Sequence, residues 1–130
     1  MDPSRRRSIE YRRQLIERAG GTLSVDQVAE LIKVTPEAVR NRIRTRSYIA
    51  VPDAKDYGLP AIQFEDGHEI RGLRTVLRAI PMESPYMRLD WLLSPEPRLQ
   101  GRRPIDVLRG GENIEEVKSA ASLVGEHGAA

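Results

Sequence analysis

The sequence predicts a mainly α protein in which a helix-turn-helix unit with a short β-hairpin precedes a small helical bundle. Two observations support this prediction. Apolar residues recur at three- and four-residue steps along most of the chain, and prolines, glycines and capping residues divide these runs into short helices. The predicted boundary separates one unit, residues 1–66, from a second, residues 67–130.

The composition narrows the class of protein. The chain has 130 residues, no cysteine, and only His68 and His127 as histidines, so we expect neither a disulfide framework nor a structural zinc site. No run reaches the roughly 18 apolar residues that span a bilayer. No apolar stretch follows the basic N-terminus either, which argues against a secretory signal. We therefore expect a cytoplasmic protein with no membrane partner.

Charge is unevenly distributed along the chain. Residues 1–50 hold 11 Lys and Arg against 6 Asp and Glu, a net charge of +5, whereas residues 51–130 hold 10 against 13, a net charge of −3. Such asymmetry is typical of a nucleic-acid partner for the basic half. A solvated, arginine-rich surface would give the same counts, so charge alone leaves both interpretations open.

The first helix is predicted within residues 5–20. Ile9 and Ile16 recur at helical spacing, while a heavily cationic surface covers the rest of the segment. Gly20 and Gly21 are typical stop signals after a helix. This segment is therefore expected to form a short amphipathic helix.

Residues 24–46 carry the pattern of a helix-turn-helix. Ser24 and Gln27 predict a capping box at the start of the first helix, whose buried stripe is expected to comprise Val28, Leu31 and Ile32. The second helix is expected to begin at an N-cap followed by a proline and to bury Ala38, Val39 and Ile43. Its other positions carry residue types that read bases or bind phosphates, since arginine can pair with guanine and asparagine with adenine. The predicted DNA-binding residues are Thr35, Arg40, Asn41, Arg42, Arg44 and Arg46. The alternative is a helical hairpin with a solvated basic face.

A β-hairpin is predicted after this unit. Residues 48–51 and 62–64 contain β-forming side chains, and a polar stretch rich in Pro, Asp and Gly separates them. In a winged helix-turn-helix such a hairpin packs on the helices and can touch the DNA backbone. We expect its main role to be structural, with Phe64 covering the core.

Four further helices are predicted from the start and stop signals that follow. The first spans residues 70–80 and ends at Pro81, and the second runs from Pro85 to Ser94. The third begins at Pro104, and Asn113 is expected to cap the last. These short helices must fold around one another, with Trp91 as a large apolar side chain between them.

The sequence gives little support for catalysis. It has no nucleophile elbow, no glycine-rich phosphate loop and no metal-ligand spacing. Glu115 and Glu116 are adjacent and therefore diverge on a helix. We expect no enzyme activity, no catalytic residue, no metal site and no cofactor.

The segment "WLLSPEPRLQGRRPIDVLRGGENIEEVKSAA" resembles the C-terminal toxin-binding domain of Xre/MbcA/ParS-type antitoxins. The resemblance covers roughly residues 70–130. Its landmarks are a Trp-Leu pair, a proline turn, a leucine before a Gly/Arg turn, a Pro-x-Asp-x-Leu helix start and a final helix with spaced Val and Ala. They fall on Trp91, Leu92, Pro95, Leu99, Gly101, Pro104, Asp106, Leu108, Gly111 and Val117. The upstream unit is shorter than the helical DNA-binding bundle that many members carry.

The resemblance implies an antitoxin that forms a homodimer, binds a cognate toxin and represses its own operon. The usual toxin in this family carries a RES domain and consumes NAD. The C-terminal end of the antitoxin blocks the active site of this toxin. The toxin-binding residues predicted on this basis are Trp91, Leu92, Leu99, Pro104, Leu108, Val117, Glu126, His127 and Gly128. The alternative is a plain dimeric helix-turn-helix transcriptional regulator whose C-terminal helices dimerise and bind no toxin.

Overall fold

The computed structural model describes residues 2–54 and 56–125 and confirms a mainly α fold with a small β-sheet. The N-terminal half contains α1 (Pro3–Arg18), β1 (Thr22–Ser24), α2 (Val25–Ile32), α3 (Pro36–Arg44), β2 (Val51–Asp53) and β3 (Asp56–Pro60). A turn of 3-10 helix, η1 (Ala61–Gln63), leads into a second small hairpin of β4 (Phe64–Glu65) and β5 (His68–Glu69). The C-terminal half contains α4 (Leu73–Ala79), α5 (Pro85–Leu93), η2 (Pro97–Leu99), α6 (Pro104–Arg109) and α7 (Ile114–Ser122).

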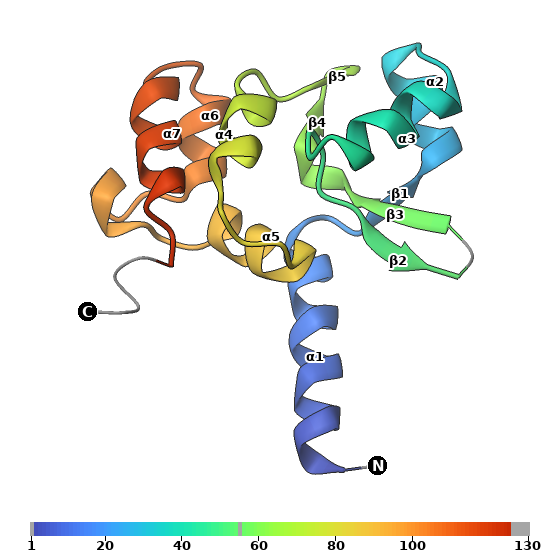
Figure 1. The fold of residues 1–130 in the computed structure, drawn as a ribbon, viewed down its shortest axis with the longest axis horizontal. Helices are drawn as coiled ribbons and strands as arrows, with labels where there is room; N and C mark the ends of the chain where they lie inside the picture. Colours follow the sequence, from blue (N-terminus) through green and yellow to red (C-terminus); the bar gives the residue numbers. More distant parts are fainter. Residues whose placement is uncertain (1, 55, 126–130) are drawn as a thin grey trace.

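The N-terminal half has the topology of a winged helix. Its antiparallel sheet has the order β1-β3-β2, and α2 packs against both α3 and β3. The element order α1-β1-α2-α3-β2-β3, with β1 paired to β3, is that of a winged helix-turn-helix, in which the β2–β3 hairpin is the wing (Figure 1).

The wing lies at different residues from those that the sequence predicted. Its strands pair Val51 with Gly58, so only Val51 belongs to both the predicted and the observed hairpin. The side chain of Gln63 accepts a hydrogen bond of 2.6 Å from the Ile49 N–H and donates one of 2.9 Å to the Ile49 carbonyl. Because a side chain satisfies both backbone groups, Ile49 needs no neighbouring strand. Phe64 instead pairs with Glu69 in the β4–β5 hairpin.

The predicted caps of the helix-turn-helix are confirmed. Ser24 and Gln27 form both bonds of the capping box, at 3.0 and 2.8 Å, and the Thr35 hydroxyl accepts the Ala38 N–H at 3.0 Å. The predicted burial of Leu31 is wrong, because its side chain is 39% exposed. The buried residues of α2 are Val25, Val28 and Ala29, and Leu31 lies beside that face.

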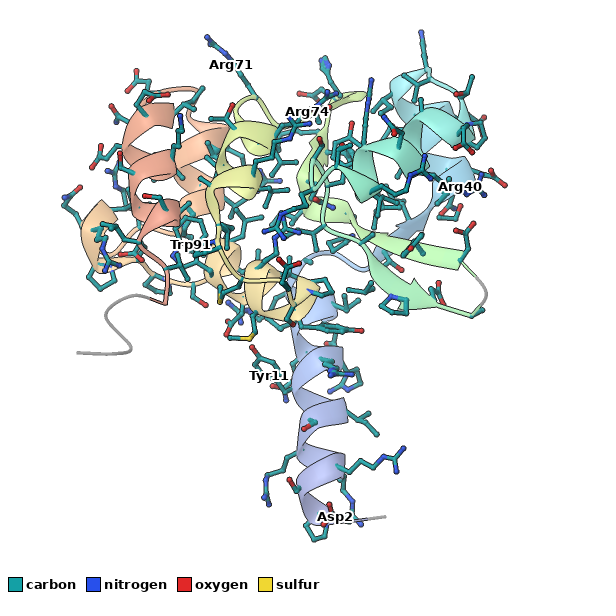
Figure 2. All side chains as sticks on the ribbon, in the orientation of Figure 1. Asp2, Tyr11, Arg40, Arg71, Arg74 and Trp91 are labelled. Atoms are coloured by element: carbon teal, nitrogen blue, oxygen red, sulfur yellow. The ribbon has the colours of Figure 1, made fainter. Side chains whose placement is uncertain are left out.

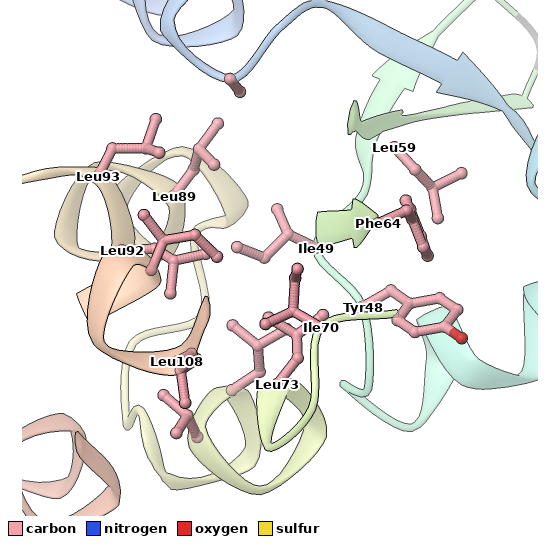
Figure 3. Packing of buried hydrophobic residues seen from close by; sticks show 14 of the residues in the cluster. Tyr48, Ile49, Leu59, Phe64, Ile70, Leu73, Leu89, Leu92, Leu93 and Leu108 are labelled. Atoms are coloured by element: carbon pink, nitrogen blue, oxygen red, sulfur yellow. The ribbon is translucent and has the colours of Figure 1, made fainter. Parts of the chain in front are cut away.

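One apolar core runs through both halves of the chain. The Tyr48 ring meets Phe64 edge-on, with centroids 5.2 Å apart, and Ile49 lies between this pair and the leucines of α4 and α5 (Figure 3). Leu73 and Leu92 belong to the same core. The predicted boundary between residues 66 and 67 falls in the turn that joins β4 and β5, and the core continues across it.

The C-terminal half is a bundle in which α7 packs against α4 and α6, and α6 packs against α5. Gly72, at φ 84°, begins α4 where a Cβ would lie 3.0 Å from Ile114 of α7, so a side chain there would separate the two helices. Asn113 precedes α7 as predicted, but its side chain makes no capping bond. Asn113 instead has a left-handed backbone, φ 58°, a conformation that asparagine tolerates.

Helix α1 projects away from the rest of the molecule, with the N-terminus at its far end (Figure 1). Leu15 is its one buried residue. The Tyr11 hydroxyl donates 2.7 Å to Asp90 of α5, and Arg18 donates 2.8 Å to the Leu93 carbonyl. These contacts fix the base of α1 on α5. Across residues 2–54 and 56–125, no helix is long and apolar enough to cross a membrane.

Candidate nucleic-acid interface

Helix α3 presents one polar stripe to solvent. Glu37, Arg40, Asn41 and Arg44 recur at three- and four-residue spacing, so they share a face, while Val39 on the opposite face is fully buried. Arg40 lies in the middle of α3 (Figure 2), and its side chain reaches Asp56 of the wing. This stripe includes three of the six predicted DNA-binding residues.

Acidic residues hold the two arginines of this stripe in place. Arg40 pairs with Asp56 of the wing at 3.1 Å, and the hydrogen bond from Arg40 to Asp56 raises the pKa of the arginine. Arg44 lies 3.3 Å from Glu37 and keeps a side chain that is 59% exposed. Both guanidiniums are therefore oriented without being buried.

Arg42 and Arg46, which the sequence placed in the same interface, turn toward the protein. Arg42 donates 3.0 Å to the Tyr48 hydroxyl. Arg46 donates to the carbonyls of Ile80 at 2.7 Å and Met82 at 3.1 Å. Arg46, two residues after the end of α3, therefore bonds to the C-terminal half, whereas Arg42 bonds to the segment that follows α3. Neither side chain belongs to the outward stripe.

A partly buried ionic network lies behind α3. Glu69 accepts 2.6 Å from the Tyr48 hydroxyl and two bonds of 2.7 Å from Arg74. Burial acts to raise the pKa of Glu69, but the hydrogen bonds from Arg74 and Tyr48 outweigh it and the pKa is lowered. The sequence analysis missed this network. Its members come from β5, α4 and the segment between α3 and β2, so no periodic pattern could have indicated it.

Arg88 of α5 is a second feature that the sequence did not predict. Its side chain is buried, Nη2 donates to the carbonyls of Leu77 at 3.1 Å and Arg46 at 3.4 Å, and Nε has no hydrogen-bond partner in the described chain. Burial, together with the charge of Arg46, lowers the pKa of Arg88 to about 10. This guanidinium has no carboxylate bonded to it among the described residues.

The remaining predicted DNA-binding residue, Thr35, is engaged by its own helix as the N-cap of α3. The wing offers Tyr57, which is 40% exposed, but it also carries the carboxylates of Asp53 and Asp56. Negative charge here opposes phosphate binding unless a cation neutralises it. Arg40 does so for Asp56.

Most of the predicted toxin-binding residues lie in the core. Five of them are buried: Leu92, Leu99, Pro104, Leu108 and Val117. In this fold they build the bundle and cannot reach a partner directly. Trp91 is half-buried (Figure 2), and its indole N–H donates 3.0 Å to the buried carboxylate of Glu96.

Trp91 also lines a surface groove of about 320 Å³ between α1 and α5, together with Tyr11, Met82 and Met87. The predicted tail residues Glu126, His127 and Gly128 lie outside the described residues. Within the described part of the chain, no three His, Asp or Glu side chains gather closely enough to hold a metal ion.

Comparison with known proteins shows a similarity in fold and no family. No family model matches the chain, and no curated protein matches it. The chain is similar to the NMR structure of Rv2175c, with 26% identity and a TM-score of 0.58 over 78% of this chain and 80% of that one. The similarity covers most of both chains.

Proposed function

We propose that this protein is a winged-helix DNA-binding regulator in which α3 enters the major groove and the wing lies along the backbone. The observation that carries the proposal is the outward stripe of Arg40, Asn41 and Arg44 on the second helix of a helix-turn-helix. Such a stripe combines the side chains that pair with guanine and adenine.

The proposal is tested by measuring the affinity of the full chain for DNA. Preferred sequences are first selected from a random pool, and binding to a duplex of about 30 base pairs is then followed by fluorescence anisotropy over a range of salt. We expect log affinity to fall with log salt by about 0.9 for each phosphate contacted. Arg44→Ala should weaken binding, and Arg71→Ala, at an exposed arginine two residues before α4, serves as the matched control. Absence of measurable binding at low salt would exclude the function.

Toxin binding is a second proposal, and it has its own supporting observation. The groove between α1 and α5 brings the half-buried Trp91 together with Met82 and Met87, and methionine-rich surfaces adapt well to a protein partner. In this proposal the chain is the antitoxin of a RES-type, NAD-consuming toxin, the buried leucines maintain the bundle, and the groove contacts the toxin.

Co-expression with the product of a neighbouring reading frame tests the second proposal. We expect the two proteins to purify together and the chain to rescue growth. Met87→Asp should abolish both effects, because Met87 is 53% exposed and its replacement leaves the core intact. Full rescue by Met87→Asp would exclude this groove as the toxin site.

A further inference from the structure

The projecting helix α1 carries an apolar groove that the proposed functions do not use. The groove has a volume of about 650 Å³, and Ile9 and Ile16 line it together with Tyr86 of α5. Ile9 is 49% exposed, and α1 buries only Leu15 in the rest of the molecule. A lone helix of this length is marginally stable in water, so its outer turns gain most from a partner that covers Ile9.

The charges beside this groove follow a specific order. Arg6, Glu10, Arg13 and Glu17 recur at four- and three-residue steps, so they form one stripe along α1. Arg13 pairs with Glu10 and Glu17 within the helix, and all three side chains remain about half exposed or more, at 57%, 48% and 66%. The signs alternate from plus to minus along the stripe.

This order of charges is complementary to the same order on a second helix that runs in the opposite direction. In an antiparallel pair of α1 helices related by a two-fold axis, Glu10 lies opposite Arg13 of the second copy, and Glu17 lies opposite Arg6 of the second copy. The same alignment places Ile9 near Ile16 of the second copy.

We propose that the occupant of the α1 groove is α1 of a second copy of this chain, packed antiparallel across a two-fold axis. The helix is about 24 Å long, and in the antiparallel arrangement the two globular bodies lie at opposite ends of the pair, so they do not collide. Arg12, near the axis, is held to one side by its position 4.6 Å from the centre of the Tyr86 ring. The interface itself does not depend on DNA binding. Only its consequence, that a dimer presents two α3 helices to two half-sites, rests on the proposed function.

Sedimentation equilibrium of the full chain tests the dimer. The expected mass is twice the 14.7 kDa of the chain at micromolar concentration. Ile9→Asp should give a monomer that remains folded, since Ile9 lies outside the core. Met87→Asp, on the opposite side of α1, is the matched control and should remain dimeric. A monomeric wild type, or a dimer that Met87→Asp disrupts and Ile9→Asp does not, would overturn the proposal.

Charge exchange tests the antiparallel register. Glu10→Arg/Glu17→Arg gives an all-positive stripe, and Arg6→Glu/Arg13→Glu gives an all-negative one. Each variant alone should be monomeric, whereas an equimolar mixture should form a heterodimer. Helix content by circular dichroism controls for melting of α1. If the mixture stays monomeric, the proposed pairing is excluded. The monomeric variants also separate the dimer from the proposed function. If they still bind one half-site and lose only binding to the second, DNA binding is supported whatever the outcome for the dimer.

Discussion

Arg40 of α3 and Asp56 of β3 form an ion pair of 3.1 Å that joins α3 to the wing. Both side chains are partly exposed, at 37% and 46%, so the pair stabilises the fold only slightly. Its larger effect is electrostatic. Asp56 places a negative charge where the proposed DNA phosphates approach, and it holds one of the cations that would contact them.

Asp56→Asn should therefore tighten binding to DNA. The change removes a repulsive charge and releases Arg40, and we expect a gain of about 1 kcal/mol, a fewfold in Kd, at low salt. Anisotropy titrations at two salt concentrations measure it, and the gain should shrink as salt rises. Weaker binding by Asp56→Asn would mean that the ion pair is needed to position the wing.

Asn41→Ala and Arg44→Ala should reduce the preference for the selected sequence. Each loss is expected to be about 1–3 kcal/mol if the side chain contacts a base edge. Arg42→Ala is the internal comparison, because Arg42 donates to Tyr48 and should mainly lower the melting temperature. Competition titrations with selected and scrambled duplexes separate the two effects. Equal losses on both duplexes would assign Asn41 and Arg44 to phosphates.

Glu69→Gln should destabilise the protein in a pH-dependent manner. Glu69 accepts bonds from Tyr48 and Arg74, so at neutral pH we expect a loss of about 1–3 kcal/mol in the free energy of unfolding. The folded-state pKa of Glu69 is lowered. Its contribution is therefore present above the unfolded pKa and is lost as pH falls through the folded value.

Denaturant unfolding of wild type and Glu69→Gln at neutral and acid pH measures this linkage. The difference between the two proteins should shrink below about pH 4. A difference that is constant from neutral to acid pH would show that the carboxylate charge is not what stabilises this network.

The caps and breaks of the helices could be predicted from the sequence because their signals are local. Ser24, Thr35 and Ser84 each accept a backbone N–H three residues on, a contact that depends on no distant residue. The wing was misplaced because the bonds between Gln63 and Ile49 replace the strand pairing that β propensity suggested. Propensity cannot detect a buried side chain that pairs with the backbone fourteen residues away.

The candidate site was predicted in part for the same reason. Helical spacing correctly indicated that Arg40, Asn41 and Arg44 share a face of α3. It could not indicate that Arg42 and Arg46 turn inward, because their partners, the Tyr48 hydroxyl and the carbonyls after α4, come from the tertiary fold. An arginine-rich segment therefore mixes solvent-facing cations with structural cations, and the two look alike in the sequence.

Trp91→Phe should show whether Trp91 is needed for its indole N–H or for its apolar bulk. The N–H bonds the buried Glu96 carboxylate, which also accepts the Arg98 N–H at 2.6 Å. In Trp91→Phe, loss of the hydrogen bond to the Glu96 carboxylate should lower the free energy of unfolding by about 1–2 kcal/mol. Trp91→Ala should lower it further, because packing is lost as well. Chemical denaturation of the three proteins gives the comparison. A Phe variant as stable as wild type would leave only the apolar role.

Arg88→Met should raise the free energy of unfolding. Arg88 is buried with no carboxylate bonded to it, and its Nε lacks a partner within the described chain, so the folded state carries an uncompensated desolvation penalty. Methionine fills a similar volume, and the Leu77 carbonyl still accepts the Ile80 N–H at 3.3 Å. We expect a gain of about 1 kcal/mol at neutral pH.

The same penalty predicts how this gain changes with pH. Burial lowers the pKa of Arg88 to about 10, below that of the unfolded chain, so above this value the unfolded state binds more protons than the folded state. Wild-type stability should therefore rise with pH relative to Arg88→Met, and the advantage of the variant should shrink from about pH 8 to about pH 11. Paired urea titrations at these two pH values measure the change. A variant less stable than wild type at both would mean that the bonds from Arg88 to the carbonyls of Leu77 and Arg46 outweigh the cost of burying its charge.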